Sequence, residues 1–97
     1  MPWQFSYEDD TYNEDDVTLG QWDRLEKILE KSWHRIDPRF SAADAKAILR
    51  TLIADRTGRD GGTVEAEVDA INTRQFLGMF KVVESDLPEE YADGIPQ

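Results

Sequence analysis

The sequence of 97 residues contains no cysteine and a single histidine, His34. Without cysteine the chain can form neither a disulfide nor a thiolate metal site, which fits a protein kept in a reducing cytosol. With one histidine and no thiol, the common pairings of a nucleophile with a base are also missing. No carboxylate or nucleophile has a recognisable spacing to His34, so we expect a structural role for it. We therefore expect no catalytic residue and no enzymatic activity.

Long apolar runs are absent as well. The longest contain two or three residues, whereas about 20 are needed to span a bilayer. The N-terminus is acidic, the reverse of the basic start of a signal peptide. A chain of this length forms one domain with one core, and we expect it to be soluble and intracellular.

Basic residues are missing from both ends of the chain. Residues 1–16 carry six acids and residues 84–97 carry five, while residues 17–83 hold ten acids and all eleven Lys and Arg. The net charge of −10 repels nucleic acid and anionic lipid. We therefore predict a helical domain over 17–83 between two acidic arms, protein partners, no nucleic acid and no membrane.

Two other patterns are incomplete as ligand sites. The pairs Asp9-Asp10 and Asp15-Asp16 lack the alternating spacing and the glycine of a calcium loop. The glycine-rich turn at residues 58–62 lacks the Lys-Ser/Thr ending of a phosphate-binding loop. We expect no metal and no cofactor.

Helical spacing dominates the middle of the chain. Thr18 with Gln21 and Ser41 with Asp44 have the spacing of helix caps. The predicted fold class is mainly α, a small bundle of three to four helices with a short N-terminal strand and acidic extended termini. The helices are expected at about 18–35, 41–57, 63–72 and 74–83. The expected core consists of Trp22, Leu25, Ile28, Leu29, Ile48, Leu49, Leu52, Ile53, Val68, Ile71, Phe76 and Phe80.

Both arms carry apolar residues. Trp3, Phe5 and Tyr7 alternate with polar residues, which predicts a short strand that either packs back on the helices or offers an edge to another chain. Residues 8–16 are expected to be a flexible acidic link, which would allow arm exchange and a homo-oligomer. The acidic C-terminal tail carries Leu87, Tyr91 and Ile95, which could compete for an apolar groove on the body.

Several short segments together resemble a known family. They are the helix start at Val17–Trp22, the break at Trp33–Pro38, the Ala-rich second helix and the ending at Asp86–Pro96. In this order they resemble the small tail assembly chaperones of long-tailed, siphovirus-type phages, particularly those infecting actinobacteria.

The resemblance implies a non-enzymatic protein that coats the tape measure protein in the host cytoplasm during tail assembly, with the tail tube protein as a second candidate partner. It further implies that the chaperone is absent from the mature virion, and that this chain is the short form of a pair made by ribosomal frameshifting. The expected client surface is the uncovered part of the Ala42–Ile53 stripe and of the Phe76–Val83 segment. The predicted protein-binding residues are Trp3, Phe5, Tyr7, Phe76, Phe80, Leu87, Tyr91 and Ile95.

Two other functions remain open from the sequence. One is a virion component, either a head-tail connector or a tail completion protein, which would stay in the particle. The other is an acidic inhibitor or DNA mimic of a host protein, although such a mimic needs a rigid acidic face.

Overall fold

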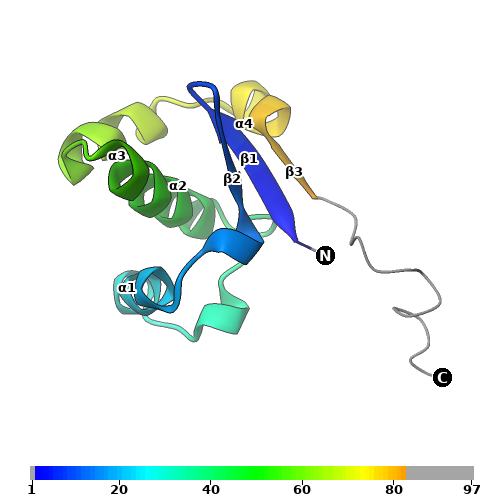
Figure 1. Ribbon diagram of the computed structural model, residues 1–97. Coiled ribbons are helices and arrows are strands. Elements are labelled where there is room, and N and C mark those ends of the chain that lie inside the picture. Colours follow the sequence, from blue (N-terminus) through cyan, green and yellow to red (C-terminus); the bar gives the residue numbers. More distant parts are fainter. Residues whose placement is uncertain (1, 83–97) are drawn as a thin grey trace, which may run out of the picture.

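The protein is described here from a computed structural model, in which residues 2–82 are placed. Figure 1 shows a small sheet beside α2, with α1 below and α4 at one end of the sheet. The strands are β1 (Trp3–Tyr7), β2 (Asp10–Asn13) and β3 (Phe80–Val82). The helices are α1 (Leu19–Leu29), α2 (Ala42–Thr57), α3 (Gly61–Asp69) and α4 (Thr73–Met79), and two 3-10 turns, η1 and η2, span Glu14–Asp16 and Trp33–Arg35.

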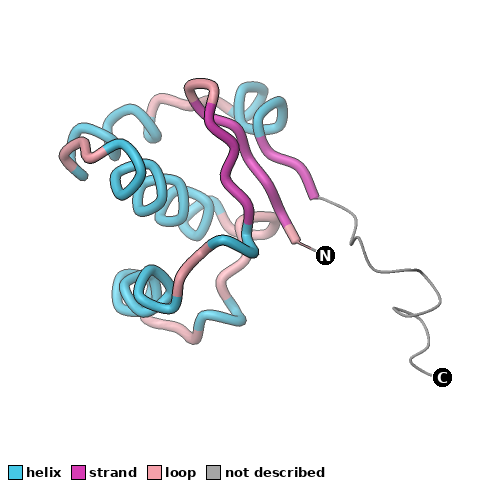
Figure 2. Tube along the Cα trace, in the orientation of Figure 1, coloured by secondary structure: helices cyan, strands magenta, loops and turns pink. Residues whose placement is uncertain are grey.

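Strand β1 lies in the middle of the sheet. The strand order is β2-β1-β3 and both pairings are antiparallel (Figure 2). Phe5 is paired with Tyr12 on one side and with Phe80 on the other. Because side chains alternate along a strand, Trp3 and Phe5 face the helices and are buried, whereas Gln4 and Ser6 lie on the opposite face. The predicted N-terminal strand is thus confirmed, and it packs back on its own chain.

A two-residue loop joins β1 to β2. Glu8 and Asp9 have φ values of 52° and 71°, which is the arrangement of a type I′ hairpin turn. Glycine adopts this backbone most easily, asparagine and aspartate adopt it less easily, and other residues do so at a larger cost. The hairpin was hard to predict from sequence, because Glu8 does not favour this turn and the loop contains no glycine.

The helix starts follow the predicted caps. The Thr18 hydroxyl accepts a hydrogen bond from the Gln21 amide at 3.1 Å, and the Gln21 side chain accepts one from the Thr18 amide at 2.9 Å. Ser41 accepts one from the Asp44 amide at 3.2 Å. Helix α3 is capped by Asp60, whose side chain accepts a hydrogen bond from the Thr63 amide.

One core joins the sheet to the helices. Seven of the predicted core residues are buried, namely Trp22, Leu25, Ile48, Leu49, Leu52, Ile53 and Val68. Leu29, Ile71, Phe76 and Phe80 are only partly buried against this core. Ile28 was predicted wrongly, since it is 48% exposed. The core also contains residues outside that prediction, chiefly Trp3, Phe5, Tyr12, Ile36 and Val64.

The predicted fold class is wrong. Over residues 2–82 the protein has four α-helices and a three-stranded antiparallel sheet, which is a mixed α/β arrangement and not a mainly α bundle. Residues 8–16, expected to be a flexible link, form the hairpin turn, β2 and η1. The acidic side chains misled the prediction because they lie on the exposed hairpin while Tyr12 alone anchors β2 in the core.

Two helix ends were also misplaced. Helix α1 ends at Leu29, where Glu30 takes the left-handed conformation, and a separate turn η2 follows. The predicted last helix ends at Met79 because Phe80–Val82 pair with β1. Helical spacing of apolar residues continued through this segment, so the local pattern gave no sign of a pairing partner 75 residues away.

Replacing Leu49 with Ala tests whether α2 is the centre of the core. Leu49 is 3% exposed, and a buried Leu→Ala change costs roughly 2–5 kcal/mol. We expect that loss in the free energy of unfolding measured with urea. Leu77→Ala is the control, because Leu77 is 67% exposed and should lose less than about 1 kcal/mol. Similar losses in both variants would contradict the assigned core.

Replacing Asp9 with Gly tests the hairpin turn. Glycine removes the steric cost of the positive φ at this position, so we expect the free energy of unfolding to rise by about 0.5–1 kcal/mol. Asp9→Ala is the matched control and should give no gain, since Ala also has a Cβ. A glycine variant no more stable than the alanine variant would argue against the type I′ turn.

Candidate functional site

An open apolar groove lies between the start of α2 and the corner where α3 meets α4. It encloses about 430 Å³. Its apolar lining includes Phe40, Ala45, Leu49, Val68, Ile71 and Phe76. We call it the α2–α4 groove. It includes parts of both segments that the sequence analysis proposed for client contact, the Ala42–Ile53 stripe and the Phe76–Val83 segment.

Phe40 is the most exposed aromatic residue of the groove. Its side chain is 83% exposed, although it directly precedes Ser41, the N-cap of α2. A large residue at this position normally packs against the fourth residue of the helix. Here that residue is Ala45, which is too small to cover a phenyl ring. Phe40 therefore remains open to a partner.

Hydrogen bonds hold the backbone beneath Phe40. The Asp37 carboxylate accepts hydrogen bonds from the Arg39 amide, at 2.9 Å, and from the Arg39 guanidinium, at 2.7 and 2.9 Å. These bonds hold the pKa of Asp37 below its usual value. The Phe40 amide donates to the Asp37 carbonyl at 3.2 Å. An exposed aromatic on a fixed turn loses little conformational entropy when it binds.

The buried carboxylate of Asp44 fastens this turn to the rest of the protein. Asp44 is 2% exposed. It accepts a hydrogen bond from the Asp37 amide at 2.9 Å and pairs with Lys31 at 2.8 Å. A buried charge is tolerated when it is paired in this way. Asp44 thus positions the groove residue Phe40 through Asp37.

The far wall of the groove belongs to α4. Asn72 and Gln75 form a capping box at its start. Phe76 lines the groove and stacks on Phe80 with 4.9 Å between ring centroids, and Phe80 stacks on Trp3 at 6.4 Å. This aromatic series connects the groove wall to the sheet.

Charges on the rim are mutually compensated. Lys46 pairs with Asp69 at 2.7 Å and with Glu65 at 3.4 Å, and these carboxylates raise the pKa of Lys46. Arg50 also lies 3.5 Å from Glu65. The rim therefore carries no strong net charge, so the groove offers mainly apolar contact.

The predicted protein-binding residues do not form one surface. Trp3 and Phe5 are buried at 2% and 1% exposure, and Tyr7 is half-buried with its hydroxyl donating to Glu67 at 2.7 Å. Only Phe76 lines the groove, since Phe80 lies behind it. Leu87, Tyr91 and Ile95 lie outside the described residues. Sequence reasoning missed Phe40, although an aromatic residue before a helix cap whose fourth helical residue is Ala was a readable signal.

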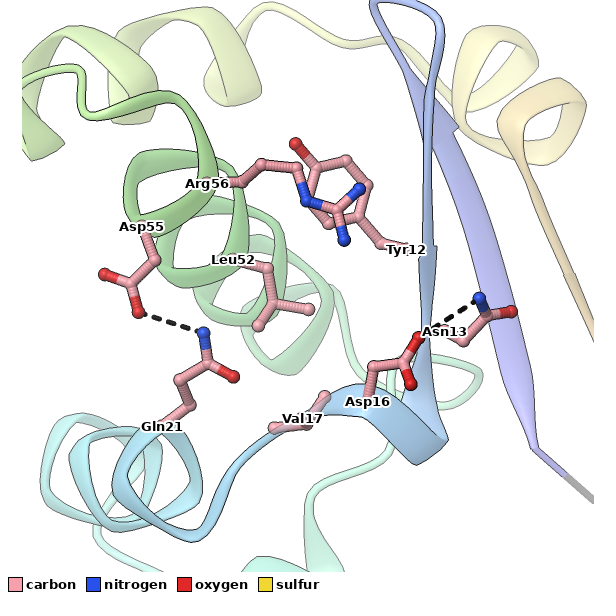
Figure 3. A pocket seen from close by; sticks show the side chains of 8 residues that line it. All are labelled: Tyr12, Asn13, Asp16, Val17, Gln21, Leu52, Asp55 and Arg56. Carbon is pink, nitrogen blue, oxygen red and sulfur yellow. Dashed lines mark hydrogen bonds between the residues drawn. The ribbon is translucent and has the colours of Figure 1, made fainter.

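A second, smaller cavity lies where the hairpin meets α1 and α2. Figure 3 shows it between Tyr12, Arg56 and Leu52, and it encloses about 220 Å³. The Arg56 guanidinium lies 4.2 Å from the Tyr12 ring centroid and donates to the Thr11 carbonyl at 2.9 Å. Burial raises the pKa of Tyr12, and its hydroxyl has no hydrogen-bond partner among the described residues. This region joins the hairpin to the helices.

Charged groups at this second cavity are also engaged. Asp55 accepts a hydrogen bond from the side-chain amide of Gln21 at 2.9 Å and pairs with Arg24. Arg24 and Gln21 hold the pKa of Asp55 below its usual value. These contacts fasten α1 to α2, so a structural role accounts for them.

The part of the chain that the structure describes, residues 2–82, shows no cluster of metal ligands. His34 is exposed and forms no ion pair with another described residue. No group of three or more potential ligands there could hold a metal ion. Within the same range, every helix is too short or too polar to cross a membrane. No protein-family model, curated protein or solved structure matches the chain.

The link between α1 and α2 should be sensitive to acid. Because the pKa of Asp55 is lower in the folded protein, its stabilising effect is complete above the unfolded pKa of about 4 and is lost as the pH falls through the folded value. We expect Asp55→Asn to lower the free energy of unfolding at pH 7 and to differ little from the wild type at pH 2. Urea unfolding at several pH values measures this.

Asp23→Asn is the control for that experiment. Asp23 forms an exposed pair with Lys27 on the same helix, which is worth about 0.5 kcal/mol or less. A pH-independent difference between Asp55→Asn and the wild type would show that the Asp55 carboxylate does not make this contribution.

Proposed function

We propose that the protein is a non-enzymatic tail assembly chaperone, which binds an apolar helical segment of a phage tape measure protein in the α2–α4 groove. The observation that carries the proposal is the exposed Phe40 above an apolar floor of Ala45, Leu49 and Val68. Helices bind such grooves by inserting side chains spaced three or four residues apart. The groove volume of about 430 Å³ can accept more than one such side chain.

The charge distribution supports the same function. The net charge of −10 favours solubility of a complex with an apolar client. The groove rim is locally balanced by the pairs of Lys46. The protein can therefore present an apolar contact surface without giving up the charge that opposes aggregation.

The experiment is co-expression of the full chain with a phage tape measure protein. We expect the chain to raise the soluble fraction of the tape measure protein and to be recovered with it. Binding in the apolar groove should weaken little with added salt, whereas a DNA mimic binds a basic target and loses affinity steeply. No complex and no gain in solubility would contradict the proposal. Recovery of the chain in purified virions would instead favour a virion component.

Phe40→Ser tests the groove itself. Removing a phenyl ring that is buried on binding costs about 1.5–3 kcal/mol, so we expect the dissociation constant for the client to rise at least about tenfold. Leu19→Ser is the matched control, since Leu19 is 80% exposed on α1 and does not line the groove. Both variants should keep the thermal stability of the wild type. Equal client affinity in the two variants would place the contact outside the groove.

A further inference from the structure

The C-terminal segment of the chain has the chemistry to fill the α2–α4 groove. Residues 84–97 contain five acids and no base. Leu87, Tyr91 and Ile95 recur every four residues. This spacing places them on one side of either a helix or an extended strand. The segment therefore combines an apolar side with a strong negative charge.

The segment starts close to the groove. Phe76 in the groove wall stacks on Phe80 at 4.9 Å, and β3 ends two residues later at Val82. The 15 residues from 83 to 97 can span up to about 50 Å when extended. Reach therefore allows the segment to return to the groove.

Cations at the α4 side can meet the acids of the segment. Arg74 on α4 and Lys81 on β3 are exposed and form no ion pair within residues 2–82. By contrast, Lys46 and Arg50 on α2 are paired with α3 carboxylates. Asn72 and Thr73 line both the groove and the neighbouring hollow that contains Arg74 and Leu77. The apolar groove and this positive charge are thus adjacent.

We propose that residues 84–97 occupy the α2–α4 groove of the same chain when no client is bound, with Leu87, Tyr91 and Ile95 on its apolar lining. The inference rests on the proposed function in taking the groove as the client site. A tethered segment has an effective concentration in the millimolar range. Weak contacts with a dissociation constant of about 1 mM therefore suffice to fill a large part of the groove. A client must displace the segment. The apparent affinity of the client is therefore its intrinsic affinity multiplied by the fraction of grooves that are open.

The test uses the full chain with Ala92→Cys, which places the only cysteine of the protein next to Tyr91. A nitroxide attached to it broadens the amide signals of nearby residues in ¹⁵N-labelled protein. We expect broadening at Ala42, Lys46 and Ile71 around the groove, and little at Glu8 and Asp9 in the hairpin turn. Adding Leu87→Ser and Ile95→Ser to the labelled chain should remove the effect.

Two other patterns would overturn the inference. Broadening centred on Trp33–Arg35, or none at the groove, would exclude the groove as the place where the segment binds. Binding between copies is detected by mixing ¹⁵N-labelled protein that carries no nitroxide with ¹⁴N protein that carries one. If the groove signals broaden in this mixture as strongly as in the doubly labelled chain, the segment binds the groove of a second molecule. No client is present in these samples, so an absence of broadening at the groove would not contradict client binding as tested with Phe40→Ser. Failure of client binding would likewise leave the broadening result standing.

Discussion

Burial of the aromatic face of β1 is the contact on which the rest of the structure depends. Trp3 and Phe5 are almost fully buried, and their strand pairs with β2 on one side and β3 on the other. Phe5 stacks on Tyr12 with 4.6 Å between ring centroids, while Trp3 stacks on Phe80. The strand thus unites the hairpin and the end of the described chain over α2. Without it, α4 would lose its connection to the core.

The groove follows from that connection. Helix α4 has no fully buried residue, and a seven-residue helix is marginal in isolation. Phe76 and Phe80 hold it through their stack, and pairing of β3 with β1 fixes Phe80. On the opposite wall, the alanine at position 45 leaves the ring of Phe40 uncovered. The groove remains open for two reasons. Pairing of β3 with β1 holds α4 in place as one wall, and the start of α2, the other wall, lacks a large side chain at position 45.

Local signals made some of these features predictable from sequence. The caps at Thr18 and Ser41 satisfy backbone donors within three residues, and the structure confirms both. Strands β2 and β3 could not be predicted in this way, because their stability comes from pairing with β1. Two left-handed residues form the hairpin without glycine, and β3 continues the apolar spacing of α4. Part of the groove was predictable from the α2 stripe, whereas its shape required the position of α4.

The distribution of ion pairs explains how an acidic protein can keep an apolar groove accessible. The cations of α2 and the α2–α3 turn are used locally: Lys46 and Arg50 pair with α3, and Arg59 pairs with Glu67 and Glu8. These pairs fasten elements together without building a strong field near the groove. The unbalanced acids of the described residues instead concentrate on the hairpin and η1, where Asp9, Asp15 and Asp16 are exposed. Charge that keeps copies apart is therefore separated from the proposed binding surface, where selectivity would come from the shape and spacing of apolar side chains.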